Sequence, residues 1–282
     1  MISVKEALQK AVKILQEHDV LKPKFSAEVL LAHVLNIKPL DIYGCFGEVL
    51  EDEQIKQYNL LVARRSKKEP LEYILGEVLF CGSKIMVNKN VLIPRVETEY
   101  WVNWAIEIIK HGNITNKVAY DLCCGSGAIA IALKKCLPEI NVCMSDISEE
   151  ALEVGRKNCK KNNVNITIRK GDFFDPFKGE KTDFIFCNPP YVSQDEYFAL
   201  SKEVRDFEPK IALLAEHNGL IFYETLAKEA FHYLNPKGKL FFEIGYNQGE
   251  TVFDLFKNGP WKRIEKNKDL SGHDRFFFLE IE

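Results

Sequence analysis

The chain has 282 residues, of which 46% are hydrophobic, and its 38 Lys and Arg against 41 Asp and Glu give a formal net charge of −3. At roughly 150 residues per domain this length predicts about two domains, and the composition excludes a disordered chain. The nearly balanced charge argues against a protein whose main task is to grip nucleic-acid phosphates, although a local basic patch is compatible with it.

Residues 1–72 are expected to form a small helical bundle. Ser3 and Glu6 make a capping box, after which apolar residues repeat at helical spacing. A second helix is expected from Ser26, a short third over 39–42, and a fourth that Asp52 caps and that runs to Arg65. Five basic residues of this part could meet an acidic partner, but a solvated helix face is the commoner meaning of such a group: Lys24, Arg64, Arg65, Lys67 and Lys68.

Residues 73–95 are expected to connect this bundle to the rest of the chain. Glu77–Cys81 and Lys84–Asn88 read as strands, and they flank Gly82-Ser83, a two-residue turn with glycine first. This arrangement predicts a β-hairpin.

From residue 96 to residue 282, short apolar strands alternate with amphipathic helices. This order predicts an α/β domain with a parallel, doubly wound sheet. The last two strands have no clear helix between them, which predicts an antiparallel edge. The expected strands are 117–120, 141–145, 166–169, 183–187, 239–244, 262–266 and 275–281, and the expected helices start at Ala128 or cover 148–162, 219–234 and 248–257.

The eight cysteines predict free thiols in a reducing, cytoplasmic compartment. No two have the C-x-x-C spacing of a structural zinc site, so no metal is expected. Residues 1–13 alternate charged and apolar side chains, which is unlike the apolar core of a signal peptide. No apolar run of the sequence approaches the ~20 residues that span a membrane.

The segment Asp121-Leu-Cys-Cys-Gly-Ser-Gly127 follows a predicted strand and precedes a predicted helix. Gly125 and Gly127 let the backbone turn tightly and approach a ligand closely. The start of the helix behind them offers unpaired N–H groups. Taken alone, the pattern fits a plain strand-to-helix loop equally well.

Two further segments follow predicted strands. Asp146 lies about 20 residues after the glycine turn, where a carboxylate can accept hydrogen bonds from both hydroxyls of a ribose. The alternative is a helix cap, for which Ser148 competes. Asp172 could accept from an adenine amino group and Phe173 could cover a ring, although a loop aspartate and a core phenylalanine are the simpler interpretation.

The most specific motif is Asn188-Pro-Pro-Tyr191, directly after the strand 183–187. Two consecutive prolines remove two backbone donors, so the carbonyls of Asn188 and Pro189 have no local amide to bind. With the side-chain carbonyl of Asn188 they form rigid acceptors beside the ring of Tyr191. Such a set suits a planar –NH2 group that must be positioned for attack on a methyl group. A proline-rich turn that happens to contain Asn is the alternative.

With these residues in place, the sequence resembles the class I S-adenosylmethionine-dependent methyltransferases of the N/D-P-P-Y/F group. Within that group it resembles the protein-(glutamine-N5) methyltransferases of peptide chain release factors. The resemblance covers nearly the whole chain, and its other segments are more specific than the four-residue motif, which DNA and RNA amino-methyltransferases share. These segments are 63–65, 69–76, Phe80 with Gly82, 91–99, Glu203-Val with Phe207-Glu-Pro209 and Ala212-Leu213, and Phe242-Glu-Ile-Gly245 with Gln248-Gly249.

The resemblance implies a seven-stranded Rossmann-like domain that uses S-adenosylmethionine and releases S-adenosylhomocysteine. The methyl group would pass to the side-chain amide of the glutamine in a Gly-Gly-Gln motif of a class 1 release factor. Residues 1–72 would dock this protein substrate, or would only stabilise the fold. We expect a monomer with no nucleic-acid or membrane partner.

The same resemblance implies the roles of individual residues. Asn188, Pro189, Pro190 and Tyr191 would hold the glutamine amide, and the catalytic candidates among them are Asn188, Pro189 and Tyr191. No strong base lies in the motif, so we expect positioning and electrostatics to carry the reaction. The cofactor-binding candidates are Asp121, Cys123, Cys124, Gly125, Ser126, Gly127, Asp146, Asp172, Phe173 and Asn188.

Two positions depart from the family pattern. The turn usually reads Asp-Leu-Gly-Thr-Gly-Ser-Gly, and Cys123 and Cys124 replace its first Gly and its Thr. We expect Cys123 to adopt a negative φ and to leave cofactor binding intact. A catalytic thiol is disfavoured, because methyl transfer from a sulfonium needs no covalent intermediate. Val96 replaces the Pro that usually follows Ile-Pro-Arg, which is expected to loosen that loop slightly.

Two other functions compete with this interpretation. An N6-adenine or N4-cytosine nucleic-acid methyltransferase would use the motif on the –NH2 group of a flipped base. The charge balance and the lack of a basic, aromatic-rich segment argue against it. A binding module without activity would keep the nucleoside pocket, and the intact motif 188–191 argues against that.

Overall fold

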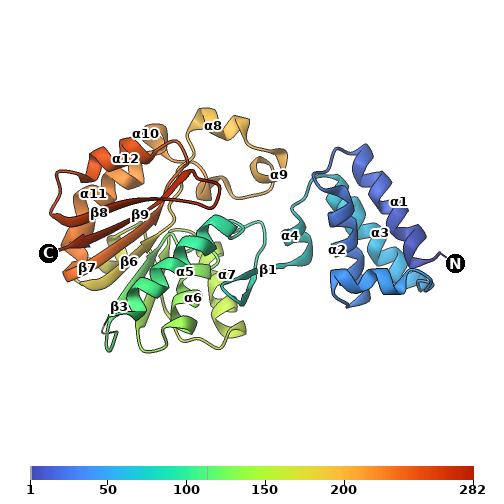
Figure 1. Cartoon of the computed structure of the whole chain (residues 1–282), viewed down its shortest axis with the longest axis horizontal. Coiled ribbons are helices and arrows are strands. Elements are labelled where there is room, and N and C mark those ends of the chain that lie inside the picture. The colour runs from blue at the N-terminus through green and yellow to red at the C-terminus, as the bar shows by residue number, and fades with distance from the viewer. Residues whose placement is uncertain (1, 113) are drawn as a thin grey trace. The chain divides into compact units, whose positions relative to one another are not determined.

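The computed structural model describes residues 2–112 and 114–282 and divides the chain into two compact units (Figure 1). The N-terminal unit contains the chain up to Gly76 together with Ser201–Phe207. The sheet unit contains Glu77–Leu200 and Glu208–Glu282. The hairpin that the sequence analysis gives to a separate linker therefore belongs to the sheet unit, and a short later segment joins the N-terminal unit.

The N-terminal unit is helical, as predicted. Ser3 and Glu6 form the capping box: the Ser3 amide donates to Glu6 Oε2 at 2.9 Å, and Ser3 Oγ accepts from the Glu6 amide at 3.3 Å. Its apolar core includes Leu15, Leu30 and Leu31, which are fully buried. The elements are α1 (Val4–Glu17), α2 (Pro23–Leu35), the 3-10 helix η1 (Pro39–Cys45), α3 (Asp52–Ser66), α4 (Leu71–Leu75) and α9 (Lys202–Arg205).

Two predicted helix starts are wrong by a few residues. Helix α2 begins at Pro23 instead of Ser26, because proline fits the first turn of a helix, where its missing N–H is not needed. Asp52 is the first residue of α3 and not its cap. The residue before it takes that place, and the Glu51 amide donates to Gln54 Oε1 at 2.9 Å.

Two of the five basic residues singled out in the N-terminal part form contacts within this unit. Arg65 is only 4% exposed and donates to Ser26 Oγ at 3.2 Å, to the Glu69 carbonyl at 2.8 Å and to Glu203 Oε1 at 2.9 Å. Arg64 forms an ion pair with Glu69. Arg65 is therefore an internal residue of this unit, which corrects its assignment to a solvated or docking face, whereas the Arg64 side chain is 38% exposed.

The predicted hairpin is present, but its turn lies one residue earlier. Strands β1 (Glu77–Phe80) and β2 (Ser83–Met86) pair with Phe80 opposite Ser83. The turn residues are therefore Cys81, with φ of 45°, and Gly82, with φ of 70°. Two positive φ values are typical of a type I′ turn, which matches the right-handed twist of the strands.

The sheet unit contains a seven-stranded sheet in the order β5-β4-β3-β6-β7-β9-β8 (Figure 1). The first five strands of this order are parallel, and β9 is antiparallel to both β7 and β8. The predicted antiparallel edge is thereby confirmed. The strands are β3 (Val118–Leu122), β4 (Asn141–Asp146), β5 (Thr167–Lys170), β6 (Thr182–Cys187), β7 (Leu234–Glu243), β8 (Trp261–Lys268) and β9 (Asp274–Ile281).

Helices pack on both faces of this sheet. On one face, Trp101 stacks on Phe186 with ring centroids 6.1 Å apart. On the other face, the neighbouring strand residue Ile185 belongs to an apolar cluster with Tyr223 and Leu226. The helices are α5 (Val96–Lys110), α6 (Ala128–Cys136), α7 (Glu149–Lys161), α8 (Gln194–Ala199), α10 (Glu216–Gly219), α11 (Ile221–Tyr233) and α12 (Gly249–Phe256), with the 3-10 helices η2 (Asp175–Phe177) and η3 (Lys210–Ala212).

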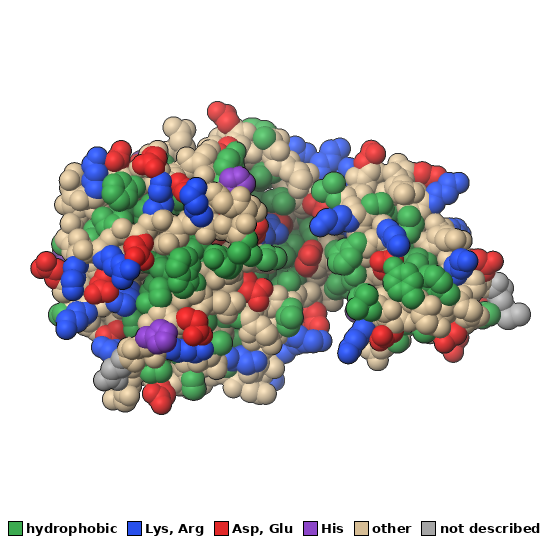
Figure 2. All heavy atoms as spheres, in the orientation of Figure 1, with side chains coloured by type: hydrophobic (Ala, Val, Ile, Leu, Met, Phe, Trp, Pro, Cys, Tyr) green, Lys and Arg blue, Asp and Glu red, His purple; other side chains and the backbone are tan. Residues whose placement is uncertain are grey.

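Sequence periodicity predicted α6, α7, α11 and α12 but did not predict α5, α8 or α10. His217 and Asn218, with φ of 53° and 55°, lie just before the predicted helix 219–234, and α11 begins at Ile221. Acidic and basic side chains are interspersed on the face shown in Figure 2, as a net charge of −3 leads one to expect. In the described part of the chain, every helix is too short or too polar to cross a membrane.

The side chain of Asn158 ties helix α7 to two neighbouring segments. It is fully buried, and its Nδ2 donates to the carbonyls of Met86 and Ser126 at 2.9 Å each, while its Oδ1 accepts from the Met86 amide at 2.6 Å. The hairpin and the glycine turn are thus both anchored on one amide group.

Replacing Asn158 with alanine leaves these backbone groups buried without a partner. We expect the Asn158→Ala variant to lose about 2–4 kcal/mol of unfolding free energy, measured by urea denaturation. The matched control is Asn162→Ala on the same helix, where the side chain bonds carbonyls nearer solvent. An equal loss in both variants would contradict this account.

Candidate active site

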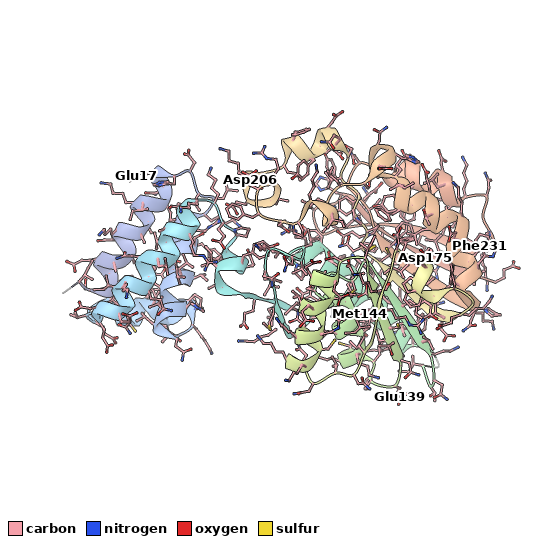
Figure 3. The ribbon with its side chains drawn as sticks, turned by 180° about the vertical axis from the view of Figure 1, so that it is seen from behind. Glu17, Glu139, Met144, Asp175, Asp206 and Phe231 are labelled. Carbon is pink, nitrogen blue, oxygen red and sulfur yellow. The ribbon has the colours of Figure 1, made fainter. Side chains whose placement is uncertain are left out.

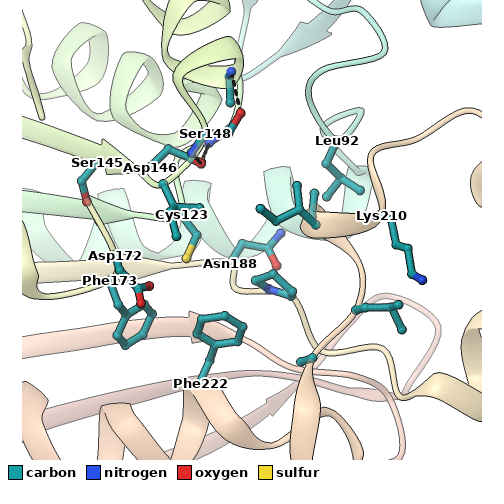
Figure 4. A pocket seen from close by; sticks show the side chains of 18 of the residues that line it. Leu92, Cys123, Ser145, Asp146, Ser148, Asp172, Phe173, Asn188, Lys210 and Phe222 are labelled. Carbon is teal, nitrogen blue, oxygen red and sulfur yellow. Dashed lines mark hydrogen bonds between the residues drawn. The ribbon is translucent and has the colours of Figure 1, made fainter. Parts of the chain in front are cut away.

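A cavity of about 710 Å³ lies at the carboxyl ends of the parallel strands (Figure 4). Volumes of this order hold small organic ligands and cofactors. The residues that follow β3, β4, β5 and β6 form one side of it. The other side is formed by residues of three segments that were not predicted as site residues: 90–92, 210–212 with 214–216, and Ile221, Phe222 and Thr225.

Six of the predicted cofactor-binding residues line this cavity: Cys123, Gly125, Asp146, Asp172, Phe173 and Asn188. The other four, Asp121, Cys124, Ser126 and Gly127, are not lining residues and lie in or beside the turn behind it. Of the predicted substrate-holding residues, Asn188 and Pro190 line the cavity, whereas Pro189 and Tyr191 do not.

The glycine turn has three residues at positive φ: Cys123 at 54°, Gly125 at 52° and Gly127 at 77°. The expectation of a negative φ at Cys123 is therefore wrong. The Cys124 amide donates to the Ser145 carbonyl at 2.9 Å, and this bond sets the path of the backbone immediately after Cys123. Figure 4 shows the Cys123 thiol inside the cavity, on the side of Asn188.

Gly127 is required for a packing reason as well. A Cβ there would approach Met144 Sδ to 3.0 Å, and a Cβ on Gly155 of helix α7 would approach Met144 Cε to 2.9 Å. Met144 is fully buried in β4 (Figure 3). Its side chain thus occupies the space that two glycines leave, which brings helix α7 close to the turn.

The carboxylate of Asp146 bridges two backbone segments. Its Oδ2 accepts from the Gly125 amide at 2.8 Å and its Oδ1 accepts from the Ser148 amide at 2.9 Å. Burial raises the pKa of this carboxyl, and the backbone hydrogen bonds act in the opposite direction. Since each oxygen has used one lone pair, each keeps acceptor capacity for a ligand hydroxyl.

Two buried oxygen atoms near the cavity have no hydrogen-bond partner among the described residues. They are Asp121 Oδ1 and Ser145 Oγ. Asp121 is fully buried, and its other oxygen accepts from the Ala130 amide at 3.0 Å. Burial raises the pKa of Asp121 to about 8. An unsatisfied buried acceptor is costly, so these atoms are suited to receive donors from a ligand.

An aromatic pair borders the cavity next to the end of β5. The rings of Phe173 and Phe222 have centroids 5.4 Å apart and are tilted by 48°. Figure 4 shows both rings with Asp172 at one end of the cavity. Phe222 comes from helix α11 and was not predicted, because nothing in its helical sequence distinguishes it from a core residue.

The motif 188–191 is supported from behind by polar side chains. Asn188 Nδ2 donates to Thr98 Oγ1 at 3.2 Å, and the Tyr191 hydroxyl donates to Glu243 Oε1 at 3.2 Å. Tyr191 packs against the apolar cluster of α11 and α12. Its predicted contact with a substrate amide stays a prediction.

One buried glutamate joins two segments that border the cavity. The Glu208 side chain is 1% exposed, accepts from the Ile93 amide at 3.0 Å and pairs with Arg95. Residues 90–92 and 210–216, on either side of these contacts, are both lining segments. Within the described residues, no cluster of three or more side chains could hold a metal ion.

Comparisons with known proteins agree with this geometry. The family models of the PrmC N-terminal domain and of the methyltransferase small domain match residues 6–76 and 105–204. The release factor glutamine methyltransferase of Thermodesulfovibrio yellowstonii is 39% identical over 255 residues, which cover 90% of this chain and 91% of that protein. The release factor glutamine methyltransferase of Leptospira interrogans is 36% identical and covers 98% of both chains.

A solved structure shares the fold of the sheet unit. The T. thermophilus 16S rRNA N2 G1207 methyltransferase (RsmC), in complex with AdoMet and guanosine, matches with a TM-score of 0.52 at 12% identity, over 73% of this chain and 50% of that one. A sheet in which only β9 runs antiparallel to its neighbours, with a cavity over the ends of β3 and β4, is the Rossmann-like architecture of the class I methyltransferases. Because relatives with one name match it at 36–39% identity over nearly their whole length, the chain belongs to the release factor glutamine methyltransferase family.

The backbone of Cys123 yields one prediction. A side chain at positive φ costs about 1 kcal/mol, so Cys123→Gly is expected to raise the unfolding free energy by about that amount. Cys123→Ala is the control, because it removes the thiol but keeps the Cβ. A gain in the alanine variant equal to that in the glycine variant would show that the thiol, and not the backbone, is responsible.

The raised pKa of Asp121 predicts that the unfolding free energy depends on pH. Its pKa is about 8 in the folded protein against an ordinary value of 3.8, so folding favours its neutral form. This contribution to stability is present at low pH and is lost as the pH rises through the folded pKa. Between about pH 5 and about pH 8, the unfolding free energy of the natural protein should fall relative to that of Asp121→Asn. Parallel pH profiles of the two proteins would refute a raised pKa.

Proposed function

We propose that this protein transfers a methyl group from S-adenosylmethionine to the side-chain amide of the glutamine in the Gly-Gly-Gln motif of a release factor. The observation that carries the proposal is the position of Asn188 and Pro190 in the wall of the same cavity as Asp146. An acceptor for an amide nitrogen and an acceptor for a nucleoside thereby face one space. Relatives that match the whole chain carry the corresponding name.

The residues around the cavity fit this cofactor. Each oxygen of Asp146 can accept one more hydrogen bond, as the two hydroxyls of a ribose require. Phe173 and Phe222 offer apolar surface beside an adenine, and Asp172 offers an acceptor for its amino group. The bound cofactor supplies an electrophilic methyl group on a sulfonium leaving group.

The residues of this chain position the glutamine amide nitrogen, which is a poor nucleophile. A glutamine amide has a delocalised lone pair, so its nitrogen must be held in line with the methyl group. The side-chain oxygen of Asn188 and the backbone carbonyls of Asn188 and Pro189 accept hydrogen bonds from the amide N–H groups and favour the positive charge that develops on nitrogen. The proton then leaves to water. Asn188 is the catalytic residue of this proposal, because it is the group in contact with the reacting nitrogen.

A nucleic-acid acceptor is not favoured. The four-residue motif alone suits an exocyclic –NH2 of a base as well as an amide. Relatives named release factor glutamine methyltransferase cover 90–98% of this chain, however, and residues 6–76 match the PrmC N-terminal domain model. We assign the docking of the release factor to the N-terminal unit on this basis, and we place the reaction in the cytoplasm, where release factors work.

A labelling experiment tests the proposal. The protein is incubated with methyl-labelled S-adenosylmethionine and, separately, with a release factor, its Gln-substituted variant, DNA and RNA. Label is expected on the release factor only. Label on a nucleic acid, or on both release factor forms equally, would overturn the proposed acceptor.

The role of Asn188 is tested by substitution at saturating cofactor. Asn188→Ala is expected to lower kcat by about 10²-fold or more, because it removes a positioned acceptor from the reacting group. Asn235→Ala is the control, since Asn235 bonds Asp183 at the opposite end of the sheet. Near-normal methyl transfer by the Asn188 variant would refute its catalytic role.

A further inference from the structure

Glu243 is a buried acid to which the proposed function assigns no role. It lies at the end of β7 and is 1% exposed. Its Oε2 accepts from the Thr98 hydroxyl at 2.6 Å and from the Trp101 indole N–H at 2.9 Å, and its Oε1 accepts from the Tyr191 hydroxyl at 3.2 Å. A buried charge is costly, so a carboxylate with this many donors calls for an explanation.

The donors define the state of this carboxyl. An indole N–H can only donate, so the oxygen that it shares with Thr98 must act as an acceptor. Burial raises the pKa of Glu243, while the bonds from Thr98 and Trp101 and the nearby Arg275 favour the ionised form. The Thr98 hydroxyl donates its single proton to Glu243 Oε2, the oxygen that also accepts from the Trp101 indole.

Because the Thr98 proton is used in the bond to Glu243, the orientation of the Asn188 side chain is also fixed. The Thr98 oxygen has only lone pairs left for Asn188, so it must receive an N–H, and Asn188 Nδ2 supplies it at 3.2 Å. The amide of Asn188 is therefore turned with its nitrogen toward Thr98 and its oxygen away from it. Without Thr98 and Glu243, the two ends of the amide could exchange by a half-turn, because they have nearly the same shape.

We propose that Glu243 and Thr98 are positioning residues that fix the amide of Asn188 with its oxygen available to the substrate nitrogen. Glu243 also holds Tyr191 directly, so one carboxylate sets the orientation of two side chains of the motif. The inference rests on the proposed function for its consequence, the rate of methyl transfer. Its structural part, the orientation of Asn188, stands without it.

The residues of this hydrogen-bonded chain, Glu243, Thr98 and Asn188, come from three separate parts of the fold. Thr98 and Trp101 are one turn apart in α5, which puts both side chains on the face that meets β7. Asn188 follows β6, the strand next to β7 in the sheet. Neighbouring strand ends thus bring the acid and the motif together, and the first turn of α5 supplies the hydroxyl between them.

Activity measurements separate positioning from fold stability. Thr98→Val keeps the shape of the side chain and removes its hydroxyl, and we expect kcat to fall roughly 10- to 100-fold with the Kd for the cofactor unchanged. Thr98→Ser keeps the hydroxyl and is expected to remain close to the natural enzyme. The control is Thr182→Val at the start of β6, where a fully buried hydroxyl bonds the Val118 and Phe184 carbonyls. Equal kcat for the Thr98 valine and serine variants would overturn the proposal.

A second measurement does not depend on activity. The side-chain amide signal of Asn188 is assigned in a ¹⁵N spectrum by its loss in Asn188→Asp. We expect this signal to shift and its protons to exchange faster in Thr98→Val and in Glu243→Gln, but not in Thr98→Ser or Thr182→Val. An unchanged signal in Thr98→Val would refute the orientation. If the natural protein fails to methylate a release factor, the proposed function fails, and this spectrum still decides the orientation.

Discussion

The cofactor side of the site depends on the carboxylate of Asp146. It receives the Gly125 amide from the turn after β3 and the Ser148 amide at the start of α7, so it joins two adjacent strand-to-helix connections. Because it is buried, its pKa is raised, and the two N–H bonds offset part of that cost. The same group that closes the turn therefore presents acceptors to the cavity, and the shape of the site and its chemistry have one origin.

The site concentrates polar groups that weaken the fold. Asp121 and Ser145 each bury an oxygen that has no partner in the described part of the chain, and Glu243 buries a carboxylate beside Trp101 and Tyr191. Cys123 adds a side chain at a backbone angle that favours glycine. Sequences usually depart from good packing where function requires it. Of these residues, Ser145 and Cys123 line the cavity in which binding and methyl transfer are proposed.

Local rules predicted much of this structure. Capping residues and helical spacing indicated the N-terminal bundle, and alternating strands and helices indicated the doubly wound sheet with its antiparallel edge. The errors arose where a tertiary contact overrides a local preference. Cys123 takes a positive φ because the turn is tied to β4 by the Cys124 amide, and the hairpin turn falls on Cys81 and Gly82 because the strand register places it there.

By itself, the sequence determined the class of fold, the glycine turn, Asp146 and the motif 188–191, because each follows a strand within a few residues and can be read from local order. Only the tertiary structure decided the partners of these residues. Thr98, Glu243 and Phe222 lie far from Asn188 and Phe173 along the chain, and their neighbours depend on which strand ends meet and which helix faces them. Hydrogen bonds and ring contacts act over a few ångströms in space, so no pattern along the chain specifies them.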